Sequence, residues 1–139
     1  MQFEFREVKP GDEALFERVA DGVSDEPVDP ARVAAYLAEP GHHMIVALKD
    51  GEIVGQCAAI IHRHPDKVTE LYIDEVGVAP ALHRQGIARK MLDAMFALGR
   101  SLGCGEAWVG TEPDNLAARG LYESRGAKAV PFVMYEYEM

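Results

Sequence analysis

The spacing of apolar and polar positions predicts strands over much of the first half of the chain. Residues 3–8 alternate apolar and charged side chains, as a half-buried strand does. Two apolar runs, residues 44–49 and 52–62, flank the dipeptide Asp50-Gly51, which is typical of a two-residue β-hairpin turn. A further run over residues 68–78 predicts a long strand. Four strands are therefore expected before residue 79.

Apolar residues at spacings of three and four predict helices between and after these strands. The clearest helix runs from Gly86 to Leu102 and is followed by Gly103, a residue suited to a helix C-cap. The other expected elements are helices over residues 12–22, 31–39 and 113–125, a strand over 106–111, and one or two closing strands over 127–138. The order β-α-α-β-β-β-α-β-α-β(β) predicts an α/β fold with a mixed sheet, of the α+β kind.

The length of 139 residues predicts one domain spanning residues 1–139. No apolar run approaches the roughly 20 residues that cross a bilayer. The first residues carry charges where a signal peptide would need an apolar segment. Cys57 and Cys104 lack metal-type spacing and are expected to be reduced thiols. A cytoplasmic location without a membrane partner is therefore expected.

The net charge of −9 argues against nucleic acid as a partner, because phosphate binding needs a basic face. The same charge would suit a cationic substrate such as an amine, an aminoglycoside or a polyamine. An acidic surface that only aids solubility explains the charge equally well. The charge becomes informative only in combination with a reaction.

The segment from Glu75 to Ala88, EVGVAPALHRQGIA, has the pattern of a strand, a loop and the first turn of a helix. The first backbone N–H groups of such a helix lack intrahelical partners and lie at the positive end of the helix dipole. Gly86 and Ala88 let an anion approach the backbone, and Arg84 and Arg89 add positive charge. The segment predicts an anion site suited to a diphosphate-bearing ligand. The alternative is an ordinary strand-to-helix turn that needs a glycine.

Residues 83–88 (HRQGIA) resemble the Q/R-x-x-G-x-G/A pyrophosphate loop of the GNAT acyl-CoA N-acyltransferase superfamily. The sequence departs from that pattern at His83, where the family usually has Gln or Arg. Residues 115–126 resemble the family's N-x-x-A-x-x-L-Y-x-x-x-G signature, and every key position matches. The two motifs and their neighbouring strands cover over half of the chain, and the predicted element order is also that of the GNAT fold.

The resemblance implies acetyl-CoA as the acyl donor. The strand before the loop would pair its backbone with the pantetheine arm, the loop would bind the pyrophosphate, and a later helix would contact the arm and the thioester. The implied cofactor-binding residues are Val76, Gly77, Val78, His83, Arg84, Gln85, Gly86, Ile87, Ala88, Arg89, Asn115, Ala118 and Tyr122. Without the resemblance, Asn115 is a helix cap and Tyr122 is a core tyrosine.

Transfer of an acetyl group to an amine needs a base, because an alkylamine is mostly protonated at neutral pH. The strand before the loop offers Glu70, Asp74 and Glu75. Period two places Glu70 and Asp74 on one face and Glu75 on the other, unless a bulge, which is common at this strand in the family, changes the parity. Glu75 is favoured and the other two are rivals, although each could be a solvated or paired carboxylate. Tyr122 would act as general acid toward the thiolate or orient the cofactor.

These features predict an acetyl-CoA-dependent N-acetyltransferase that transfers the acetyl group directly to a primary amine of a small cationic acceptor. Runs such as residues 53–55 and 71–76 resemble the aminoglycoside 3-N-acetyltransferase branch of the family. A peptide or protein amine is the rival acceptor. From a different class, the rival is a non-catalytic acyl-CoA-binding sensor module.

Two further expectations concern metals and assembly. His42, His43, His62 and His64 show neither helical ligand spacing nor a cysteine partner, so they are expected to be surface or acceptor-site residues and no metal is expected. Dimers are common among relatives, and the closing strand over residues 132–137 could pair across a homodimer interface.

Overall fold

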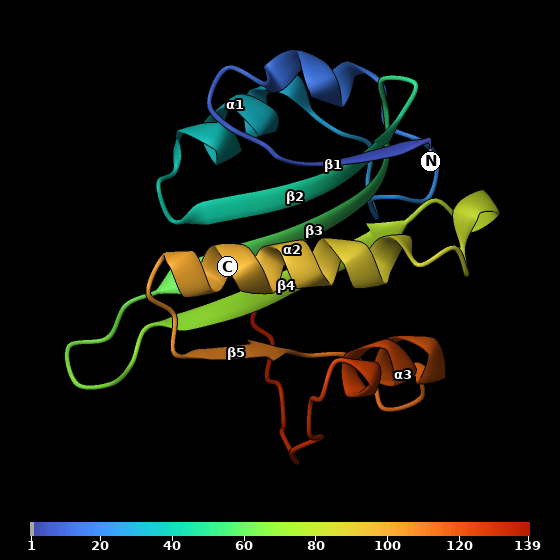
Figure 1. Cartoon of the computed structure of the whole chain (residues 1–139). Helices are drawn as coiled ribbons and strands as arrows, with labels where there is room; N and C mark the ends of the chain where they lie inside the picture. Colours follow the sequence, from blue (N-terminus) through green and yellow to red (C-terminus); the bar gives the residue numbers. More distant parts are fainter. Residues whose placement is uncertain (1) are drawn as a thin grey trace.

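The computed structural model describes residues 2–139 and contains one five-stranded sheet in the order β1-β2-β3-β4-β5 (Figure 1). The strands are β1 (Phe3–Glu7), β2 (His42–Lys49), β3 (Glu52–His62), β4 (Glu70–Val78) and β5 (Glu106–Val109). The first four are antiparallel neighbours, whereas β5 runs parallel to β4. The helices are α1 (Pro30–Ala38), α2 (Ile87–Ser101) and α3 (Leu116–Ser124), with 3-10 turns η1 (Glu13–Glu17) and η2 (Pro80–Leu82). The predicted mixed sheet, the hairpin and the long helix after the loop are confirmed.

Helices cover both faces of the sheet, which explains why β2 and β3 are apolar along almost their whole length. On one face, Met91 and Met95 of α2 pack against alternate residues of β2, Ile45 and Ala47. On the other face, the residues between these, including Val46, pack with the segment that carries η1 and α1. Figure 1 shows α2 crossing the middle of the sheet, and α3 beside β5. The two helical layers fix the position of β4, which carries the site.

A β-bulge interrupts β4 close to its C-terminal end. Ala58 of β3 pairs with Glu75, whereas the next residue, Ala59, pairs with Ile73, so Asp74 is the extra residue on β4. A bulge of this kind locally changes which face successive side chains occupy. The simple period-two assignment of the β4 carboxylates therefore fails beyond Ile73.

The prediction of a helix over residues 12–22 is wrong after Glu17. One 3-10 turn, η1, forms, and the chain then runs extended beside β3. The carbonyl of Arg18 accepts from the N–H of Ile53, and the N–H of Ala20 donates to the carbonyl of Ile53, at 2.8 and 2.9 Å. These bonds use backbone groups that a continuing helix would need for itself.

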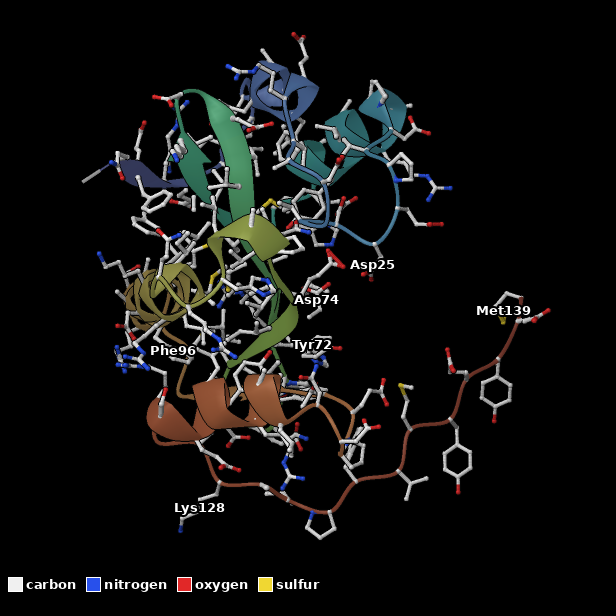
Figure 2. The ribbon with its side chains drawn as sticks, turned by 90° about the vertical axis from the view of Figure 1, so that its right-hand side faces the viewer. Asp25, Tyr72, Asp74, Phe96, Lys128 and Met139 are labelled. Atoms are coloured by element: carbon white, nitrogen blue, oxygen red, sulfur yellow. The ribbon has the colours of Figure 1, made fainter. Side chains whose placement is uncertain are left out.

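The closing strands expected over residues 127–138 do not form within this chain. That segment has no regular secondary structure, and its large apolar side chains are exposed, with Phe132 73% and Tyr137 85% accessible. Figure 2 shows the segment leaving the body of the molecule and ending at Met139, far from the sheet. A strand is stable only when a neighbour satisfies its backbone groups, and β5, the sheet edge, is only 4 residues long. Within residues 2–139, no helix is long and apolar enough to span a membrane.

Candidate active site

The site begins where β4 and β5 stop pairing. Their parallel ladder ends at Ile73 and Val109, after which β4 continues to Val78 while the chain turns away toward α3. The second half of β4 thus has no strand neighbour on that side among residues 2–139. A cavity of about 410 Å³ opens there. Its walls include the β4 backbone, the chain just after β5, and one face of α3.

On the β4 wall, the backbone N–H and C=O groups of the strand edge have no strand neighbour among residues 2–139, and the side chains are small. Val76, Gly77 and Val78 all line the cavity. Gly77 has to be glycine, because a Cβ there would collide with the carbonyl oxygen of Val23. An extended arm that carries amide groups fits such an edge, because it can add itself to the sheet as a strand would.

The loop after β4 has the geometry of an anion site. Gly86 has φ 78° and forms the N-cap of α2, a conformation that glycine adopts without strain, and Arg84 also has a positive φ of 66°. No side chain among residues 2–139 caps this helix end, so the backbone N–H groups of its first turn remain free for a ligand. Together with the helix dipole, they form a site suited to the pyrophosphate of a CoA molecule.

His83, the departure from the family pattern, has a structural contact in this loop. Its Nε2 donates to the carbonyl oxygen of Val78 at 2.9 Å, which ties the loop back to the end of β4. His83 also lines the cavity. The side chain therefore positions the loop, whatever further contact it makes with a bound cofactor.

The opposite wall is the N-terminal half of α3. Asn115 caps this helix, because its Oδ1 accepts from the N–H of Ala118 at 3.1 Å, and the amide NH₂ of Asn115 is left to donate elsewhere. Asn115, Ala118 and Tyr122 all line the cavity, as expected for residues on one helix face. Tyr122 is half-buried against the core, and burial is the main cause that raises the pKa of its phenol. The phenol is therefore protonated at neutral pH and able to donate a proton.

Three carboxylates lie at the β4 end of the cavity. The bulge brings both Asp74 and Glu75 to the lining, and Asp25 joins them from the loop before α1 (Figure 2). Burial raises the pKa of Glu75, and the neighbouring Asp25 and Asp74 raise it further. Burial also raises the pKa of Asp74, in part offset by its own backbone N–H and by His42. Such a group of carboxylates attracts a cation and can accept its proton.

Glu70 is not brought to the cavity. It occupies the first position of β4, four residues before Asp74, which corresponds to about 13 Å along a strand. Its neighbour is His64, whose imidazole holds the pKa of Glu70 below its usual value. Of the three candidate bases, Asp74 and Glu75 meet the other site residues and Glu70 does not.

Two site residues were missed from the sequence. Gln56 is a buried amide, 6% exposed, in the middle of the apolar β3, and its Nε2 donates to Glu75 Oε1 at 2.8 Å and to the Val23 carbonyl at 3.2 Å. A polar residue within an apolar strand is the sequence signal that could have identified it. Asp25 lies in an acidic loop whose position relative to β4 depends on the tertiary fold, so no local signal identified it.

Comparison with known proteins decides the family. The model of the Acetyltransferase (GNAT) family matches residues 12–127. The chain belongs to the GNAT acetyltransferase family. It is similar to N-alpha-acetyltransferase RimI of Mycobacterium tuberculosis (strain ATCC 25618 / H37Rv), with 32% identity over 108 residues, which are 78% of this chain and 66% of RimI. This GNAT chain thus spans just under two thirds of the length of that curated relative.

Solved GNAT structures share the whole fold. An aminoglycoside acetyltransferase, HMB0005, from an uncultured soil metagenomic sample has a TM-score of 0.83 and 22% identity, covering 100% of this chain and 99% of the other. AAC(6')-Iy in complex with the bisubstrate analog CoA-S-monomethyl-acetylneamine has a TM-score of 0.79 and 18% identity, covering 100% and 99%. At such identities the likeness establishes the fold. The GNAT fold and family expected from the two sequence motifs are confirmed, and acetyl-CoA is the donor of this family.

Proposed function

We propose that the chain is an acetyl-CoA-dependent N-acetyltransferase that transfers the acetyl group directly to a primary amine of a small cationic acceptor. The observation that carries the proposal is a single cavity with Asp25, Asp74 and Glu75 at one end and the Tyr122 phenol on another wall. A protonated amine is attracted to the three carboxylates, and the thioester of a CoA laid along β4 lies toward Tyr122.

Each group then has a defined role. Glu75, held by Gln56, or its neighbour Asp74 takes a proton from the ammonium, and the neutral amine nitrogen attacks the thioester carbon. The C–S bond breaks as the C–N bond forms, and Tyr122 gives its proton to the departing thiolate. The attacking nitrogen then loses its second proton to the Tyr122 phenolate, which restores the phenol and leaves a neutral amide, and the base releases its proton to solvent. Cys57, the nearest buried thiol, has its pKa raised to about 12, mainly by burial, so it is a poor nucleophile for a covalent route.

The cofactor contacts proposed from the sequence fit this arrangement. Val76, Gly77 and Val78 supply the free strand edge, and Asn115 supplies a free amide NH₂. Residues 84–89 supply the anion site at the start of α2. Ala118 lines the cavity with a small side chain, which leaves room for a CoA arm between β4 and α3.

The acidity of the cavity favours an acceptor with several positive charges, and an aminoglycoside is one such molecule. A peptide or protein α-amine is the second candidate, supported by the similarity to RimI. The test is release of free CoA thiol from acetyl-CoA with a panel of aminoglycosides, polyamines, amino acids and peptides with free N-termini. Turnover confined to polycations supports the proposal. Turnover confined to peptides supports the second candidate, and acetyl-CoA binding without turnover on any amine supports a sensor.

We also propose that the chain forms a homodimer through residues 127–139. This segment exposes seven large apolar side chains, and the same chain has an open sheet edge at β5 to which a second copy's segment can add as a strand. Sedimentation at micromolar concentration is expected to give a dimer for the full chain and a monomer for a chain ending at Lys128. A monomeric full chain would contradict the proposal.

A further inference from the structure

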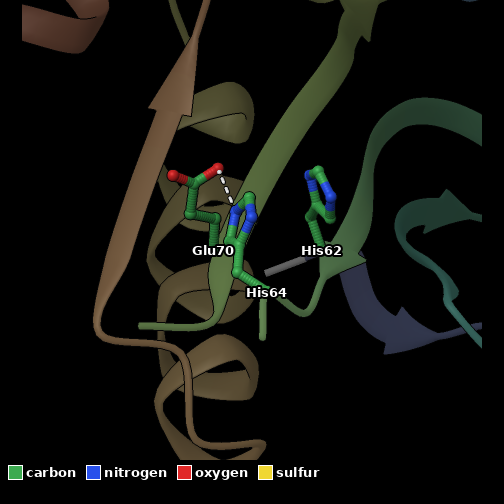
Figure 3. A group of neighbouring side chains, drawn as sticks. All are labelled: His62, His64 and Glu70. Atoms are coloured by element: carbon green, nitrogen blue, oxygen red, sulfur yellow. Dashed lines mark ion pairs between the residues drawn. The ribbon is translucent and has the colours of Figure 1, made fainter. Parts of the chain in front are cut away.

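A second group of polar side chains lies at the opposite end of β4 from the cavity. His62 ends β3, Glu70 begins β4, and His64 lies in the connection between them (Figure 3). The nearest ligand-type atoms of the three side chains, one from each, all lie within 4.8 Å of one another. The rings of His62 and His64 lie side by side, with their centroids 4.0 Å apart. The hairpin connection thus gathers two imidazoles and one carboxylate, although their sequence spacing is not that of a known metal motif.

The contact between His64 and Glu70 is not an ordinary hydrogen bond. His64 Nε2 lies 3.3 Å from Glu70 Oε1, and the two side chains are 13% and 18% exposed. The orientation is unsuited to hydrogen bonding, so this buried nitrogen has no hydrogen-bond partner among residues 2–139. A buried imidazole nitrogen and a carboxylate oxygen thus lie close together without a hydrogen bond, and a cation bound to both atoms would satisfy the nitrogen.

We propose that His62, His64 and Glu70 form a binding site for a divalent transition-metal ion of the Zn²⁺ type. Two imidazoles and one carboxylate are a ligand set that Zn²⁺ uses in proteins. Two ligand atoms at Zn²⁺ bond lengths in tetrahedral geometry are roughly 3.3 Å apart, which matches the His64–Glu70 distance. His62 is exposed and free to change rotamer, so it can complete the set, and solvent supplies the fourth ligand. The earlier expectation of no metal rested on sequence spacing alone.

The metal would join the end of β3 to the start of β4 and order the connection between them. Lys67 is exposed in this connection, three residues before Glu70, so its charge opposes a metal at the site. Substitution of Lys67 by a neutral residue should therefore strengthen metal binding, whereas loss of any ligand should weaken it.

The test is calorimetric titration of the full chain, freed of any polyhistidine tag, with Zn²⁺, Ni²⁺ and, as a hard-cation control, Mg²⁺. One Zn²⁺ or Ni²⁺ per chain is expected, with little Mg²⁺ binding, because Mg²⁺ prefers oxygen ligands. His62→Asn, His64→Asn and Glu70→Gln should each weaken Zn²⁺ binding about tenfold or more. Lys67→Ala should strengthen it about two- to threefold.

The matched control is His43→Asn. His43 also faces a carboxylate, with its Nδ1 3.4 Å from Glu7 Oε2, but it belongs to no group of three metal-ligating side chains within residues 2–139. His43→Asn should leave the Zn²⁺ affinity and the Zn²⁺-induced rise in Tm unchanged. Because His62 is exposed, His62→Asn should fold normally and still lose that rise. No 1:1 binding, or equal binding by wild type and the three ligand variants, would overturn the proposal.

Discussion

The two ends of β4 carry the same kind of side chain in opposite electrostatic surroundings. At the C-terminal end, Asp74 and Glu75 lie with Asp25 at one end of the cavity, and burial together with like charge raises the pKa of Glu75. At the N-terminal end, Glu70 faces an imidazole, which lowers its pKa. The carboxylates at one end have raised pKa values, whereas the carboxylate at the other end has a lowered pKa and stays ionised beside His64.

The difference comes from neighbours and not from the strand itself. The β-bulge at Asp74 brings two consecutive side chains to one cavity, which a regular strand would place on opposite faces. Gln56 then fixes one of them by a hydrogen bond from β3. Glu70 has neither the bulge nor the acidic neighbours. We therefore expect the carboxylates at the C-terminal end of β4 to serve proton transfer and the one at the N-terminal end to make a structural or metal contact.

The largest expected effect separates the two ends by activity. The double variant Asp74→Asn, Glu75→Gln should lower kcat/KM by about 10³-fold, because it removes both the attraction for the ammonium and the proton acceptor. Glu70→Gln should change kcat/KM by no more than about threefold. Thiol release with a fixed amine acceptor measures both. An equal loss in the two variants would show that the distinction between the ends is wrong.

The sequence predicted the fold and several residues that line the cavity, such as Gly77, Asn115 and Tyr122, but not the arrangement of the three carboxylates. Residues 83–88 and 115–126 are local motifs in which the chain itself sets the loop and the helix start, so their pattern was sufficient. The bulge at Asp74 and the approach of Asp25 depend on how β3 and the loop before α1 pack on β4, and no local pattern encodes them. One or two closing strands were expected over residues 127–138, but a strand also needs a partner, and the sequence does not say whether that partner is this chain or another.

Tyr122→Phe tests the wall opposite the carboxylates. The substitution keeps the ring that packs on the core and removes the proton donor, so kcat should fall about 10²-fold while the KM for acetyl-CoA changes little. Steady-state kinetics with varied acetyl-CoA separates the two parameters. A rise in KM at constant kcat would instead assign Tyr122 to cofactor binding.

Gln56→Met tests whether the hydrogen bond from Gln56 sets the pKa of Glu75. The Gln56 amide donates to the ionised form of Glu75 and so lowers its pKa, against the larger effect of burial. Its removal should raise that pKa, and the acid limb of the kcat/KM profile should move to higher pH, by up to about one unit. Cys57→Ala, at the next position of β3, is the control, since Cys57 pairs with Val76 and no hydrogen bond joins it to Glu75 among residues 2–139. An unmoved acid limb in Gln56→Met would mean that Glu75 is not the titrating base.

The smallest expected effect is on stability, and its sign differs between the ends. Because the folded-state pKa of Asp74 is raised, the folded protein favours the protonated form, and stability falls as the pH rises through that pKa. Asp74→Asn removes this cost and should raise Tm at neutral pH, by on the order of 1–2 °C, with the gain shrinking as the pH falls toward the raised pKa. Glu70→Gln in the presence of EDTA should lower Tm by a similarly small amount, because the pKa of Glu70 is lowered in the folded protein and its ionised form therefore stabilises the fold. Thermal unfolding of both variants between pH 5 and pH 8 measures the contrast. If Asp74→Asn instead lowers Tm at neutral pH, the ionised Asp74 stabilises the fold, and the idea that its burial destabilises the folded protein is wrong.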